Sequence, residues 1–129
     1  RGDSLAVAEG YFREVGRVAE KKPTILGHID LITKLNAGNR FFDEEAPRYR
    51  TAALEALHRA DPAKTLLEIN TGGVSRGYRT APYPALFLLR VWGAASSSPP
   101  TPTVKSICFS AMTRRRSWPG RLDSRSRRC

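Results

Sequence analysis

Two short segments of this 129-residue chain carry residues that could do chemistry. Residues 27–31 read GHIDL and residues 68–77 read EINTGGVSRG, and each segment leads from an apolar, strand-like stretch into a polar or glycine-rich loop. Enzymes built from alternating strands and helices display their reactive groups at the carboxyl ends of the strands. In such a position His28 is expected to be a metal ligand or an acid–base group, and Arg76 a clamp for an anion.

The elements that must position these residues alternate between helix and strand. Apolar residues at helical spacing predict three helices. The first ends before Pro23, the second ends at residue 60, and the third has Pro84 in its first turn. Two short apolar runs predict buried strands. The expected order is helix 3–22, strand 24–26, helix 46–60, strand 65–69 and helix 84–92, with polar loops at 34–46 and 70–84. This alternation is typical of α/β architecture, and two short strands need neighbours to form a stable sheet.

Other polar residues in these elements invite plainer interpretations. Glu68 falls within the strand pattern, and we expect it to have a structural, hydrogen-bonded role. His58 lies on a predicted helix and is expected to face solvent. Gly72 and Gly73 are expected to serve backbone geometry, because no GxxxxGK[ST] spacing accompanies them.

Five segments together resemble a known family. They are GHIDL (27–31), NAGNRFF (36–42), PRYRTAALEAL (47–57), EINTGGVSRGYR (68–79) and APYPALFLL (81–89). The chain over residues 3–92 resembles the histidinol-phosphatase branch of the PHP (polymerase and histidinol phosphatase) superfamily. The resemblance implies a distorted β/α barrel and hydrolysis of L-histidinol phosphate to L-histidinol and phosphate, a step of histidine biosynthesis.

The resemblance also implies roles for individual residues. The family holds a cluster of divalent metals (Zn, Mn or Fe) on histidines and carboxylates, and His28 would be one catalytic ligand. Arg76 and Arg40 would hold the phosphate of a small monoester substrate, and Asn70 would contact substrate or order its loop. Asp30, two residues after His28, could orient the ligand.

Several ligands of the family are missing from this sequence. A His-x-His pair and further ligands would precede residue 1, and no Asp-x-His pair follows residue 84. We therefore expect a fragment of the barrel, inactive by itself.

The C-terminal part differs in composition. Net charge is +10, yet residues 104–129 contain eight basic residues and one acidic residue, and residues 96–103 are all Ser, Pro or Thr. We expect a partial phosphoesterase domain at 1–94 and a disordered linker and basic tail at 95–129. Arg114, Arg115 and Arg116 beside Trp118 leave open a nucleic-acid-binding alternative, although nucleic acid is not the expected partner.

A shifted reading frame offers an explanation for this tail. Suppose that the serines from 96 to 98 use TCN codons. In the frame that begins at the third base of each codon, residues 95 to 103 then read NTC three times, NCC twice, NAC, NCC and NAC. These encode three apolar residues, two small residues and then a polar–small–polar triplet. The result fits a strand followed by the Asp-x-His pair that the family carries here. We interpret the tail as frame-shifted.

The remaining features concern the cysteines and the cellular location of the protein. Cys108 and Cys129 lie in the odd tail and define neither a disulfide framework nor a zinc site. No apolar run is long enough to span a membrane, and no signal segment begins the chain. A cytoplasmic protein without a membrane partner is expected. Another PHP-type phosphoesterase remains the nearest alternative for its function.

Overall fold

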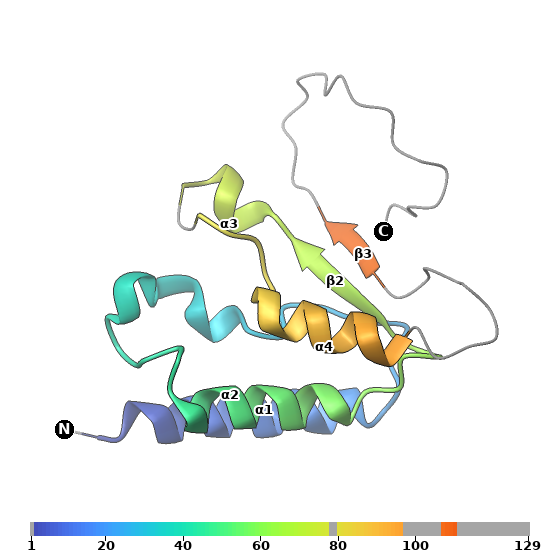
Figure 1. The fold of residues 1–129 in the computed structure, drawn as a ribbon, viewed down its shortest axis with the longest axis horizontal. Coiled ribbons are helices and arrows are strands. Elements are labelled where there is room, and N and C mark those ends of the chain that lie inside the picture. Colours follow the sequence, from blue (N-terminus) through green and yellow to red (C-terminus); the bar gives the residue numbers. More distant parts are fainter. Residues whose placement is uncertain (1, 78–79, 97–106, 111–129) are drawn as a thin grey trace.

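The computed structural model describes residues 2–77, 80–96 and 107–110. Helices and parallel strands alternate along the chain (Figure 1). In order they are α1 (Ser4–Ala19), β1 (Ile25–Leu26), η1 (Leu31–Leu35), η2 (Ala37–Asn39), α2 (Pro47–His58), β2 (Leu66–Asn70), α3 (Gly72–Ser75), α4 (Leu86–Ser96) and β3 (Ile107–Ser110).

Helix α1 forms where the sequence pattern places it. The Asp3 carboxylate accepts hydrogen bonds from the backbone N–H groups of Leu5 and Ala6, at 3.0 and 3.3 Å, and so satisfies two donors that a helix start leaves free. The buried stripe recurs every three to four residues and consists of Ala8, Phe12, Gly16 and Ala19. The helix ends at Ala19, earlier than the expected Lys22, which has a positive φ of 53°.

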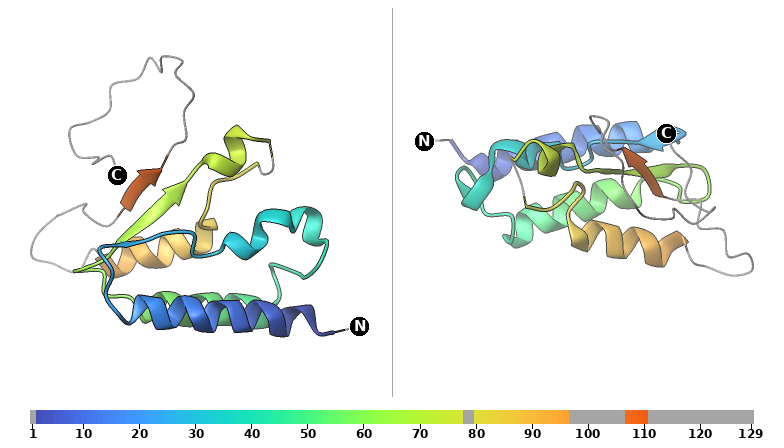
Figure 2. Two further views of the ribbon diagram at one scale, coloured as in Figure 1. Left: turned by 180° about the vertical axis from the view of Figure 1, so that it is seen from behind. Right: turned by 90° about the horizontal axis from the view of Figure 1, so that it is seen from above.

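Helix α2 lies along α1, and the two pack through an aromatic cluster (Figure 2). The ring centroids of Phe12 and Tyr49 lie 5.3 Å apart, edge to face, and Phe42 stacks on Tyr49 at 5.5 Å. At the far end of the pair, a Cβ on Gly16 would lie 2.8 Å from Cδ of Arg59. Because Gly16 has no side chain, the Arg59 side chain can lie across α1 at this position.

The three strands form one parallel sheet in the order β1-β2-β3. Leu26 is paired with Leu67, and Ile69 with Phe109. Along β2, burial alternates as a half-covered strand requires: Leu67 and Ile69 are buried, and Leu66, Glu68 and Asn70 are partly exposed. The expected α/β class is confirmed at this level.

Two described elements extend into the segment expected to be linker and tail. Helix α4 runs to Ser96, past residue 94, and residues 107–110, expected in a disordered tail, form β3. A parallel strand beside β2 satisfies backbone groups of β2 that would otherwise face solvent. The rest of 97–129 lies outside the described residues, and so does the interpretation of its reading frame.

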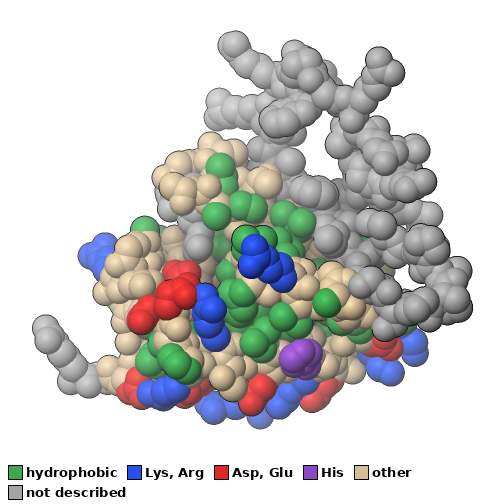
Figure 3. All heavy atoms as spheres, viewed as in Figure 1, with side chains coloured by type: hydrophobic (Ala, Val, Ile, Leu, Met, Phe, Trp, Pro, Cys, Tyr) green, Lys and Arg blue, Asp and Glu red, His purple; other side chains and the backbone are tan. Residues whose placement is uncertain are grey.

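Helix α4 is apolar on most sides. Leu88 and Trp92 are buried, whereas Leu86 is 62% exposed. In Figure 3, apolar side chains gather around α4, and charged ones gather along α1 and α2. Within the described part of the chain, no helix combines the length and apolarity needed to cross a bilayer.

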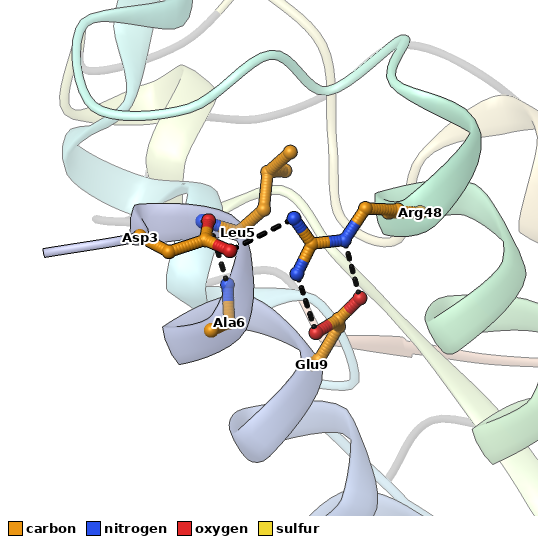
Figure 4. Close-up of polar contacts among 5 residues, drawn as sticks. All are labelled: Asp3, Leu5, Ala6, Glu9 and Arg48. Carbon is orange, nitrogen blue, oxygen red and sulfur yellow. Dashed lines mark hydrogen bonds and ion pairs between the residues drawn. The ribbon is translucent and has the colours of Figure 1, made fainter.

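Arg48 ties the start of α2 to the start of α1 (Figure 4). Its Nε and Nη2 donate to the two carboxylate oxygens of Glu9, both at 2.9 Å, and its Nη1 donates to Asp3 at 2.8 Å. Hydrogen bonding to Arg48 lowers the pKa of both carboxylates. The same contacts raise the pKa of Arg48.

Phe12→Ala tests the aromatic cluster between the helices. Because the ring is fully buried, we expect a loss of about 3–5 kcal/mol in the free energy of unfolding. Urea denaturation followed by circular dichroism measures it, with Val7→Ala on the exposed face of α1 as control. Equal stability of the two variants would contradict the packing described here.

Arg48→Met tests the ion pairs by pH. The folded pKa values of Asp3 and Glu9 lie below their ordinary values of 3.8 and 4.5. Their contribution is therefore present above about pH 4.5 and is lost as the pH falls through the lowered values. We expect wild-type protein to lose more stability on acidification than Arg48→Met does. Identical acid slopes in thermal melts would refute this, and Arg17→Met, at an exposed pair, is the control.

Candidate functional site

His28 lies at the carboxyl end of β1 in an unusual backbone conformation. Its φ is 56°, in the left-handed region that non-glycine residues seldom adopt. Holding such a residue there costs on the order of 1–3 kcal/mol, so neighbouring contacts must hold it. The strained position turns the chain from β1 into η1.

Contacts from two other elements hold the His28 backbone. Its N–H donates to Oε2 of Glu68 on β2 at 3.2 Å. Its carbonyl accepts the Tyr11 hydroxyl of α1 at 2.7 Å and the backbone N–H of Leu31 at 3.1 Å. Both backbone polar groups of the strained residue are thus satisfied.

The same Glu68 oxygen also contacts the imidazole. Nδ1 of His28 lies 3.2 Å from Oε2 of Glu68. The His28 side chain is 54% exposed, whereas that of Glu68 is only 12% exposed. The ring therefore rests on a largely buried carboxylate, and its other nitrogen, Nε2, lies on the opposite side of the ring. This arrangement suits one ligand to a metal ion or one proton acceptor.

Gly27 leaves the space in which this carboxylate sits. A Cβ at position 27 would lie 2.7 Å from Oε2 of Glu68, closer than such contacts occur. The glycine of the GHIDL segment therefore leaves room for the Glu68 carboxylate at this position.

Asp30, in the loop that follows His28, is completely buried. Its Oδ2 accepts the backbone N–H of Ala85 at 2.7 Å, which ties this loop to the residue before α4. Burial raises the pKa of Tyr11, and the nearby Asp30 carboxylate adds to the rise. The carboxylate on the His28 ring is Glu68, the residue for which the sequence predicted a hydrogen-bonded structural role.

Asn70 ends β2 and orders the loop that follows. Its Oδ1 accepts the backbone N–H of Gly72 at 2.8 Å, at the start of α3. Its backbone exchanges hydrogen bonds with Tyr83 at 2.8 and 2.9 Å. Gly73 is buried against the Tyr83 ring, where a Cβ would lie 3.0 Å away, so close packing on Tyr83 leaves little room for a side chain here.

The two predicted phosphate-binding arginines lie on different loops. Arg76 is the exposed residue that ends α3, on the connection that follows Asn70. Arg40 follows η2, and its guanidinium lies over the Phe41 ring at 5.2 Å. Since parallel strands end at one edge of their sheet, His28 and Asn70 share that edge. Arg40 belongs to the η2 loop.

Candidate metal ligands do not cluster within the part of the chain that the structure describes. No group of three or more His, Cys, Asp or Glu side chains among these described residues lies close enough to hold a metal ion. A groove of about 510 Å³ runs elsewhere, between α1 and α2, and none of the predicted site residues lines it. Residues of both charges line it, among them Arg13, Glu55 and Arg59.

Sequence reasoning missed two contacts of the site. The bond from the Tyr11 hydroxyl to the His28 carbonyl was not predicted, and neither was the contact between Glu68 and the ring. The one signal in the sequence was Gly27, whose missing side chain leaves room for the Glu68 carboxylate beside His28. His58 ends α2 and is exposed, as predicted. The arginine-rich segment 114–116 lies outside the described residues.

Comparisons with known proteins were negative. No protein-family model, curated protein or solved structure matches the chain.

Tyr11→Phe removes the hydroxyl that holds the His28 carbonyl. We expect a loss of about 0.5–1.5 kcal/mol in the free energy of unfolding, the usual worth of one intramolecular hydrogen bond. Urea denaturation measures this, and the backbone amide resonances of residues 28–31 should shift. An unchanged spectrum would show that the hydroxyl does not hold this loop.

The same variant carries a pH prediction. The folded pKa of Tyr11 lies above its ordinary value of 10.0, so its contribution is present below about pH 10 and is lost as the pH rises through the folded pKa. Wild-type protein should therefore lose more stability than Tyr11→Phe between about pH 9 and 11. Thermal melts across this range check the sign.

Proposed function

We propose that this chain is part of a PHP-type, metal-dependent phosphatase that hydrolyses L-histidinol phosphate to L-histidinol and phosphate. One observation carries the proposal: an exposed imidazole at the carboxyl end of a parallel strand, with one nitrogen on a buried carboxylate and the other available. A carboxylate behind a histidine is the usual setting of a metal ligand.

The positions of the family-like segments support the proposal. GHIDL follows β1 and EINTGG ends β2, so both lie at the edge of the sheet where β/α enzymes carry their chemistry. The alternation of parallel strands and helices is compatible with a piece of a β/α barrel. The apolar surround of α4 suits a helix that packs on further elements of a larger fold.

Residue roles follow from the chemistry of the substrate. A phosphate monoester resists hydrolysis more than most biological bonds do, and a bound divalent metal supplies a hydroxide nucleophile at neutral pH. His28 fits one ligand position through Nε2. The remaining ligands must come from outside the described residues. Arg76 is proposed to grip two phosphate oxygens with its guanidinium, and Asn70 to hold the loop that presents Arg76.

The first test uses the intact phosphatase that carries these segments. His28→Ala should lower kcat/KM for L-histidinol phosphate at least about 100-fold and reduce bound metal, because a ligand is removed. His58→Ala, at the exposed end of α2, should leave both unchanged. Activity on other phosphate monoesters alone would assign another PHP-type substrate.

Arg76→Ala separates phosphate binding from metal binding in the same protein. We expect KM for the substrate, and the inhibition constant of inorganic phosphate, to rise about 10- to 100-fold while metal content stays constant. Equal loss of metal and of phosphate affinity would argue against a clamp. The 129-residue chain itself should show no metal-dependent turnover, and measurable turnover by it would overturn the fragment interpretation.

A further inference from the structure

We infer that the outer face of α1 and α2 is an interface at which two copies of this chain associate about a two-fold axis. Arg13 of each copy pairs there with Glu55 of the other copy. The inference goes beyond the proposed function and does not depend on it. It rests on the groove between the two helices and on two charged side chains that line this groove.

The groove is accessible to a macromolecular partner. All the residues that line it belong to α1, to α2 or to the residue after α2, and among the described residues none from the sheet or α4 does so. Phe12 and Ala56 are buried at the helix contact, whereas Arg13, Thr51 and Glu55 are exposed. The face therefore presents polar and charged groups above a contact that is already closed. Such a surface suits association directed by charge.

Arg13 lies beside a carboxylate that is already occupied. Hydrogen bonding to Arg48 is the main cause of the lowered pKa of Glu9, and the nearby charge of Arg13 adds to it. Both carboxylate oxygens of Glu9 accept from Arg48, at 2.9 Å each (Figure 4). Arg13 itself makes no hydrogen bond or ion pair with any described residue. Its guanidinium can therefore donate to a carboxylate from outside the chain.

Glu55 is the corresponding anion on the other helix of the groove. It lies on α2, one turn before Arg59, and both residues line the groove. Arg59 is already paired, because its Nη1 donates to Glu20 at 3.2 Å. Within residues 2–77, 80–96 and 107–110, the exposed Glu55 carboxylate makes no hydrogen bond or ion pair. One cation on α1 and one anion on α2 thus remain for a partner.

A groove with one such charge of each sign is complementary to a second copy of itself. The contacts of Arg48 with Glu9 and of Arg59 with Glu20 each join residues 39 apart, so α1 and α2 run in the same direction. A two-fold axis along the groove then brings α1 of one copy over α2 of the other, and each contact forms twice.

The register of the two helices makes this pairing reachable. With partners 39 residues apart, Arg13 is level with Ala52, and Glu55 lies three residues further along α2. At about 1.5 Å per residue, this offset is about 4.5 Å, within the reach of an extended arginine side chain. Both pairings in the dimer have the same offset, because the axis repeats one contact.

The size of the face sets the strength of the association. α1 has 16 residues, so the face is about 24 Å long and, across two helices, about 20 Å wide. This corresponds to about 500 Å² per copy and about 1,000 Å² in total, near the lower limit for specific interfaces. We therefore expect a weak dimer whose specificity comes from the two charge pairs.

The experiment is sedimentation velocity of the full 129-residue chain at concentrations up to about 1 mM. We expect an equilibrium between monomer and dimer. Arg13→Glu and Glu55→Arg should each raise the dissociation constant at least about 10-fold, because each turns two attractions into two repulsions. The matched controls are Arg90→Glu on α4 and Glu14→Arg on α1, exposed positions that do not line the groove, and they should keep the wild-type value.

A mixture of the two groove variants tests the reciprocal pairing directly. Each variant alone places like charges in both pairs, whereas Arg13→Glu mixed one to one with Glu55→Arg places opposite charges in both. We expect the mixture to associate at least about 10-fold more tightly than either variant alone. The chain that carries both substitutions should also dimerise by itself. A mixture of Arg90→Glu and Glu14→Arg should associate no more tightly than the unsubstituted chain.

The remaining outcomes overturn the inference. A chain that stays monomeric at every concentration leaves the groove to another partner. A dimer that both groove substitutions leave intact uses another surface. Variants that do not recover when mixed exclude the reciprocal pairing. Circular dichroism checks that each variant is folded. None of these readouts involves turnover or metal content, so this inference and the phosphatase proposal can fail separately.

Discussion

The parallel register between β1 and β2 is the constraint on which the rest of the structure depends. Pairing of Leu26 with Leu67 sends both side chains to the helices and leaves Gly27 opposite Glu68 on the other face. Because side chains alternate along a strand, a slip by one residue would turn the Glu68 carboxylate into the apolar core and expose Leu67. Burying that charge without a partner would cost several kcal/mol, so the hydrophobic pattern of a five-residue strand determines where the site's carboxylate lies.

Helix packing reaches the same site from the other side of the fold. Phe12 anchors α1 in the aromatic cluster with Tyr49, and its neighbour Tyr11 then extends to the His28 carbonyl. A residue in the left-handed region persists only where its surroundings hold it, and here α1 and β2 each contribute one hydrogen bond to its backbone. The strained position of His28 is therefore a product of the core, which places α1 and the sheet at a set distance from each other.

Much of the fold could be predicted because its elements depend on local patterns. The stripe of α1, the proline that begins α2 and the alternation in β2 are visible in the residues themselves. The errors fall where tertiary contacts decide. The short helix α3 contains two glycines, poor helix formers, and it forms where Asn70 accepts the Gly72 N–H and Gly73 packs on Tyr83. Residues 107–110, in the segment expected to be a disordered tail, pair with β2 as a third parallel strand.

By itself the sequence determined the α/β class and the approximate positions of the three main helices, because periodicity and proline act over a few residues. Only the tertiary structure decided which carboxylate meets the imidazole. Asp30, two residues from His28, was the residue that could orient it; its Oδ2 accepts the Ala85 N–H, and it is Glu68, 40 residues away, whose Oε2 lies 3.2 Å from the ring Nδ1. The physical reason is that parallel pairing brings distant residues into register, and no local pattern encodes which residue of one strand will face which residue of another.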